Sequence, residues 1–156
     1  MPEVTLPVVP GMEGCHWPFR KAAAKDWPKL FALLLDGRSI KARKATGWLV
    51  DYAGPLNKSL KMAWKIASGG AHGLRKRSVK EKALTKMPQD WSRLAAHTET
   101  ITSAARQAIF DNILHSCGTT LTAALTIQAK HSAGFMVSKD CQKGTIGSTL
   151  NKTMNV

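Results

Sequence analysis

The sequence is short of acidic residues, and this shortage is its strongest signal. It holds 10 Asp and Glu against 23 Lys and Arg in 156 residues, so its formal net charge is +13 at neutral pH. An excess of one charge destabilises a compact fold by self-repulsion and usually persists where a polyanion neutralises it. Few and scattered carboxylates also argue against a nuclease, which needs clustered acids to hold metal ions. The composition therefore predicts a polyanion-binding protein rather than an enzyme.

Cysteines and catalytic motifs are scarce as well. Cys15, Cys117 and Cys141 form no CxxC pair, so neither a complete disulfide framework nor a characteristic zinc site is expected. The sequence contains no GxSxG, HExxH or phosphate-binding P-loop pattern. We therefore expect no catalytic residue, no metal site and no cofactor.

Long apolar runs are missing. The longest one spans residues 30–35, far short of the roughly 18 residues that a membrane-spanning helix needs. The N-terminus lacks a basic region and carries Pro2, Pro7 and Pro10, so it does not look like a signal peptide. We expect neither integral membrane association nor secretion by a signal peptide. The sequence does not identify a cellular compartment. We expect the protein to be associated with nucleic acid, for example in a virion.

The apolar periodicity and the capping residues predict an all-α fold. Five to six helices are expected to form a small bundle over residues 18–134, between an extended N-terminal arm, 1–17, and an irregular polar tail, 135–156. The arm is apolar, so we expect it to lie on this protein or on a neighbouring copy. The expected helices are 27–36, 40–53, 56–68, 79–87, 91–116 and 119–131.

The charge divides the predicted domain into a basic half, 20–86, and a neutral packing half, 90–132. Seventeen basic and four acidic residues lie between Arg20 and Lys86, whereas the rest of the chain holds six of each sign. Such asymmetry is typical of proteins that contact nucleic acids or membrane surfaces.

The segment 56–68 is the most informative predicted helix. Lys58, Lys61 and Lys65 lie within about 60° of one another at helical spacing, with no acid among them. Solvated faces usually mix both signs, so an unmixed lysine stripe favours phosphate contact. The opposite side is apolar and is expected to pack in the core, as is Trp91 of the next long helix. That side consists of Leu56, Leu60, Ala63, Trp64 and Ala67.

Twelve cations are candidates for contact with a nucleic-acid backbone, because lysine and arginine side chains bind phosphate oxygens. They are Arg38, Lys41, Arg43, Lys44, Lys58, Lys61, Lys65, Arg75, Lys76, Arg77, Lys80 and Lys82. Trp17 and Trp48 lie away from the predicted apolar faces, so they are candidates for stacking on bases or for contacts between copies.

These observations predict a non-enzymatic, largely sequence-independent protein that binds and packages DNA or RNA. It would be of the viral coat, nucleocapsid or nucleoid type and would assemble along the polymer, with the arm 1–17 and the tail 135–156 reaching further copies. Two alternatives remain open. One is an RNA-binding component of a larger ribonucleoprotein such as a ribosome, and the other is a peripheral membrane or matrix protein held by lysines on anionic lipid.

Overall fold

The computed structural model describes residues 8–11, 13–74, 81–84 and 103–143. In these ranges the fold is all-helical, as the sequence predicts, with seven α-helices, four of them of seven residues or more, and no strand. The chain divides into two compact units, 1–39 together with 80–156, and 40–79. Each unit is described separately below.

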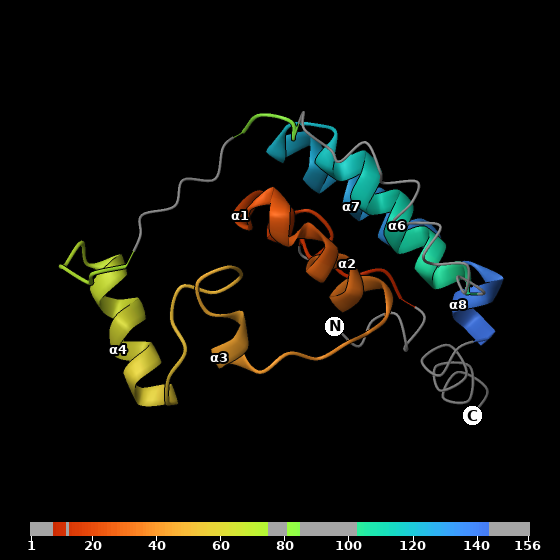
Figure 1. Ribbon diagram of the computed structural model, residues 1–156. Helices are drawn as coiled ribbons and strands as arrows, with labels where there is room; N and C mark the ends of the chain where they lie inside the picture. Colours follow the sequence, from red (N-terminus) through yellow and green to blue (C-terminus); the bar gives the residue numbers. More distant parts are fainter. Residues whose placement is uncertain (1–7, 12, 75–80, 85–102, 144–156) are drawn as a thin grey trace, which may run out of the picture. The chain divides into compact units, whose positions relative to one another are not determined.

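The first unit contains five α-helices and one short 3-10 helix. The long helices α6 (Ala104–Cys117) and α7 (Leu121–Met136) lie side by side (Figure 1), joined by a three-residue turn. Before them in the chain come α1 (Trp17–Lys21), η1 (Ala24–Asp26) and α2 (Trp27–Leu35), and after them α8 (Lys139–Lys143). Both α1 and α2 carry a proline in the first turn, where no intrahelical N–H is lost.

The core of this unit lies between α2 and α6. Leu30 and Leu35 of α2 and Ile109 and Ile113 of α6 are fully buried. The four-residue spacing of Ile109 and Ile113 is the helical periodicity that the sequence shows. The ring of Phe19 in α1 completes the core. One aromatic chain of contacts runs from Trp27 through Phe19 and Phe31 to Phe110 of α6.

The described part of the predicted arm lies on its own chain. Val9 and Pro10 are buried, and residues 13–16 form a turn that leads into α1, in place of the extended backbone expected through residue 17. The backbone N–H of Cys15 donates to Oε1 of Gln128 on α7 at 3.1 Å, and both residues are buried. Contact of the arm with neighbouring copies stays a prediction.

The C-terminal helices begin and end elsewhere than expected. Helix α6 starts at Ala104 because Ser103 is extended and its hydroxyl accepts the N–H of Arg106 as an N-cap. Residues 91–102, the earlier part of the expected helix with Trp91, lie outside the described residues. Helix α7 continues through Gly134, and α8 occupies part of the stretch expected to be irregular. The hydroxyl of Ser138 accepts the N–H of the buried Cys141 and so holds α8 in place.

The short segment 81–84 is not helical, although the sequence predicts a helix over 79–87. The backbone carbonyl of Glu81 accepts the N–H of Leu121, and its side chain accepts the N–H of Thr122 at 2.9 Å. Glu81 therefore caps the first turn of α7. A carboxylate at this position accepts hydrogen bonds from N–H groups without an intrahelical partner and interacts favourably with the positive end of the helix dipole. The rest of 79–87 lies outside the described residues.

The second unit contains α3 (Ala42–Ala45) and α4 (Leu56–Ala67). The expected helix 40–53 ends after α3, because Thr46 is extended and Gly47 adopts a φ of 87°, a left-handed conformation that favours glycine. The expected helix 56–68 is confirmed as α4, and Gly69 with a φ of 72° follows its C-terminal cap. Of residues 40–74, only Ala45 is buried, so the described part of this unit has almost no apolar core.

Candidate nucleic-acid interface

The described part of the second unit, residues 40–74, contains six of the candidate cations. Lys41 precedes α3, Arg43 and Lys44 lie on α3, and three further lysines lie on α4. All six side chains are exposed, and Asp51 is the single acid between residues 40 and 74. Within the described residues none of the six forms an ion pair, whereas cations of the first unit do. This unit therefore presents positive charge that the described acids do not neutralise.

Helix α4 places its three lysines on one side. Lys58, Lys61 and Lys65 follow one another at spacings of three and four residues, so they form a single stripe about 10 Å long. Only Ser59 and Met62 of α4 are half-buried, and the Ser59 hydroxyl donates to the carbonyl of Gly54 at 3.1 Å. The helix thus touches its own unit through a narrow side that carries no lysine.

The apolar side of α4 is uncovered. Leu56 is 75 % exposed and Trp64 is 74 % exposed, and no residue of the helix is buried. The prediction that this side packs in the core, with Trp64 as a core residue, is therefore wrong. The physical reason is that the described part of the second unit offers no opposing apolar surface. One sign of this is visible in the sequence, because no apolar run comparable to 30–35 lies near the helix.

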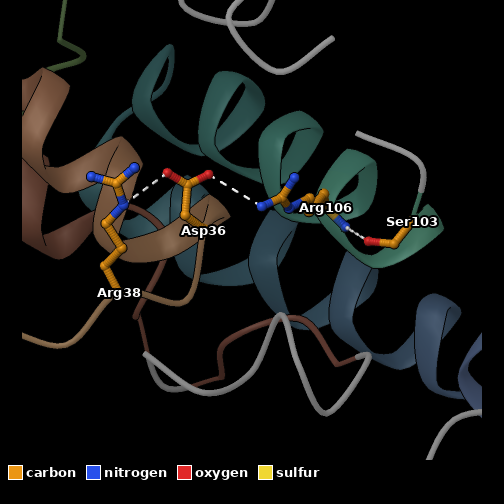
Figure 2. Close-up of polar contacts among 4 residues, drawn as sticks. All are labelled: Asp36, Arg38, Ser103 and Arg106. Carbon is orange, nitrogen blue, oxygen red and sulfur yellow. Dashed lines mark hydrogen bonds and ion pairs between the residues drawn. The ribbon is translucent and has the colours of Figure 1, made fainter. Parts of the chain in front are cut away.

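Arg38 differs from the cations of the second unit because an acid binds it. Its Nε lies 3.3 Å from Oδ2 of Asp36, and Nη2 of Arg106 lies 3.2 Å from Oδ1 of the same carboxylate (Figure 2). Asp36, just after α2, thereby connects the end of that helix to the first turn of α6. Arg38 is 70 % exposed but partly neutralised, so it is a weaker phosphate-binding candidate than the lysines of α4. Sequence reasoning did not single out Arg106.

Lys82 is exposed, but its backbone takes part in a structural contact. Its carbonyl accepts Nη1 of Arg20 at 2.7 Å, and Nη2 of Arg20 donates to the carbonyl of Thr119 at 2.8 Å. Arg20 thus binds one carbonyl of the segment 81–84 and one just beyond the C-terminus of α6, where a cation is favourable. Four further candidates, Arg75, Lys76, Arg77 and Lys80, lie outside the described residues.

The two tryptophans proposed for stacking or interface contacts lie in different units. Trp17 opens α1 and is partly exposed. Trp48 is half-buried, and its indole N–H donates to the carbonyl of Lys44 at 2.8 Å. Trp64, which sequence reasoning assigned to the core, is more exposed than either. Among the described tryptophans it is therefore the one best placed to meet a partner.

Two buried side chains of the first unit, His16 and Cys117, are held in their neutral forms. Burial, and secondarily the Arg20 cation, lower the pKa of His16 to about 4. Burial raises the pKa of the Cys117 thiol to about 12, so this thiol is protonated near neutral pH. In the described ranges, no three His, Cys, Asp or Glu side chains gather as a metal site would require. None of the described helices is long and apolar enough to cross a bilayer.

The chain matches no protein-family model, no curated protein and no solved structure. Its function is therefore inferred from its own residues.

Proposed function

We propose that this protein binds and packages nucleic acid through the phosphate backbone, largely without reading sequence, and without enzymatic activity. The supporting observation is the set of six exposed cations between residues 40 and 74, which form no ion pair with the described residues. A phosphate backbone would supply the missing negative charge and release its counterions in exchange. The protein would assemble along the polymer as a coat, nucleocapsid or nucleoid protein does.

The lysine stripe of α4 suits a regular polyanion. Lys58 and Lys65 are separated by about 10 Å along the helix axis, a length over which a DNA duplex presents about six phosphate charges. Each of the three lysines could therefore meet a phosphate without bending the polymer. Lysine contacts of this kind position a protein on a nucleic acid but do not distinguish one base from another.

The decisive measurement is binding as a function of salt and sequence. Nuclease-treated protein is titrated with labelled DNA and RNA oligomers of unrelated sequence, and fluorescence anisotropy is followed over a series of salt concentrations. We expect similar affinities for all sequences and a linear fall of log K with log salt concentration. Strong preference for one sequence, or no binding at low salt, would contradict the proposal.

A matched pair of variants separates the α4 stripe from net charge. The test variant replaces Lys58, Lys61 and Lys65 by Gln, which keeps helix propensity and removes three charges. The control replaces Lys130, Lys139 and Lys143, exposed lysines of the first unit, by Gln. The test variant should reduce the salt slope by about 2 to 3, roughly 0.9 per lost phosphate contact, and the control should not. Equal losses in both variants would mean that only net charge matters.

Binding stoichiometry distinguishes packaging from the ribonucleoprotein alternative. A packaging protein binds one copy per fixed length of polymer, so the number of bound copies grows with oligomer length. A component of a defined ribonucleoprotein binds one copy per RNA at a single site. Saturation at one copy on long RNA would favour the second reading.

A further inference from the structure

Helix α4 presents two surfaces that nucleic-acid binding alone does not explain together. Its lysine stripe is exposed, and so is a continuous apolar side that includes two leucines and a tryptophan. A shallow hollow on this side is lined mainly by Leu60, Ala63, Trp64 and Ala67. Exposed apolar patches of this kind mark surfaces that a partner covers.

Three partners can be compared against these two surfaces. A nucleic-acid backbone would neutralise the lysines but would leave Leu56 and Leu60 in water. A second copy could cover the leucines, but each copy brings six cations and one acid between residues 40 and 74, so two such units repel each other. An anionic lipid surface offers hydrocarbon to the apolar side and phosphate or carboxylate groups to the lysines. It is the one partner of the three that complements both.

We propose that α4 docks on an anionic membrane surface, with its apolar side inserted at the boundary between headgroups and acyl chains. Helices that bind membranes in this way carry lysines on the polar side and leucine or tryptophan on the other. With 12 residues α4 is about 18 Å long, too short to cross a hydrocarbon core of about 30 Å, so it would lie in the plane of the interface.

The positions of individual residues fit this orientation. At 100° per residue, Trp64 lies at the edge of the apolar side that is nearest to Lys61, where an indole ring would reach the headgroup level. The lysine stems can run along the helix and bring their ammonium groups to the lipid phosphates. The same unit contributes further positive charge from three cations outside α4, namely Lys41, Arg43 and Lys44. This proposal rests on the apolar side of α4. Because the same three lysines would bind nucleic acid in the proposed packaging function, lipid and nucleic acid would compete for this helix.

The test is sedimentation of nuclease-treated protein with lipid vesicles. One set of vesicles is made of phosphatidylcholine alone and the other also contains phosphatidylserine. The variant L60Q/W64Q removes the apolar contacts and keeps every lysine. The control L125Q makes the same chemical change at an exposed leucine of α7 in the first unit. Far-ultraviolet circular dichroism checks that both variants keep the helix content of the unchanged protein.

We expect the unchanged protein and L125Q to sediment with the phosphatidylserine vesicles and L60Q/W64Q to bind at least tenfold more weakly, because two large apolar side chains are lost from the contact. Replacing Lys61 by Gln should weaken binding about fivefold, as expected for one lysine near an anionic surface. Full binding by L60Q/W64Q would overturn the proposal, since the lysines alone would then hold the protein. The proposal also fails if the unchanged protein does not sediment with the phosphatidylserine vesicles. A loss of self-association or of affinity for single-stranded DNA in L60Q/W64Q would then identify a second copy or exposed bases as the partner of this side.

Discussion

The buried side chain of His16 should make the first unit sensitive to mild acid. His16 is fully buried, and neither ring nitrogen has a hydrogen-bond partner among the residues that the structure describes. Burial disfavours the charged imidazolium, and Arg20 adds repulsion, so the pKa of His16 falls from 6.5 to about 4. The folded protein therefore keeps His16 neutral at a pH where the unfolded chain binds a proton.

The sign and the pH window follow from this difference. Between about pH 6.5 and pH 4 the unfolded state holds more protons than the folded state, so the free energy of unfolding falls as the pH falls. Above this window the full stability is present, and below it both states are protonated at His16. A shift of this size corresponds to at most about 3 kcal/mol in total, and to about 2 kcal/mol by pH 5.

The variant H16L removes the titrating group and keeps an apolar side chain of similar size in the same place. Because both ring nitrogens lack partners, the replacement breaks no hydrogen bond that the structure shows. We expect H16L to be at least as stable as the unchanged protein at neutral pH, since it removes the desolvation cost of two polar atoms. We also expect it to lose most of the pH dependence in the window above.

Thermal unfolding followed by circular dichroism at a series of pH values measures both effects. For the unchanged protein of 156 residues, a loss of about 2 kcal/mol by pH 5 lowers the midpoint by about 4 to 8 °C. The control H115L replaces an exposed histidine of α6 and should keep the pH dependence. The reasoning is refuted if H16L shows the same acid sensitivity as the unchanged protein, or if it unfolds several degrees lower at neutral pH.

Three further predictions concern the first unit. E81Q should speed amide hydrogen exchange at Thr122, because the Thr122 N–H loses a carboxylate acceptor. Hydrogen bonds from Thr122 lower the pKa of Glu81, so the unchanged protein loses stability when the pH falls below the ordinary Glu pKa. The E81Q variant has no carboxyl group at this position and should not show this loss. D36N breaks the contacts to Arg38 and Arg106, and should lower the free energy of urea unfolding by about 0.5 to 1 kcal/mol at low salt and by less at high salt. I113A leaves a cavity in the α2–α6 core and should lower the same free energy by about 3 kcal/mol. An unchanged urea midpoint in I113A would contradict the core assignment.

The sequence predicts those parts of the fold that depend on neighbours a few residues away. Gly37, with a φ of 64°, follows α2 where the pattern places its end, and Gly69 does the same for α4. The spacing of Ile109 and Ile113 identifies the buried side of α6. In each case the determining contact lies within one or two helical turns, so periodicity and capping rules suffice.

Contacts between distant residues escape the same reasoning. Glu81 caps a helix that starts 40 residues later, and Arg20 binds carbonyls near residue 119. In the sequence, Glu81 follows Ser78 at the spacing of a local capping box, and Arg20 belongs to the basic half 20–86. Only the packing of α1, α6 and α7 in one unit brings them to their actual partners. The exposure of Trp64 is a similar case, since an amphipathic pattern shows which side of a helix is apolar but not whether anything covers it.

The second unit shows why a surface partner should matter for α4. An isolated helix of 12 residues is marginal in water even for favourable sequences, and most helices in proteins are stabilised by packing of their apolar side. In α4 no residue is buried, and three lysines of like charge follow one another without an acid. Neutralising the lysines would relieve only the repulsion between them, which is a small term for exposed charges. Covering Leu56, Leu60 and Trp64 would add the larger, hydrophobic term. A partner that both neutralises the lysines and covers the apolar side would stabilise α4 more than a polyanion that only neutralises the lysines. A lipid surface can do both, whereas a nucleic-acid backbone can only neutralise the lysines.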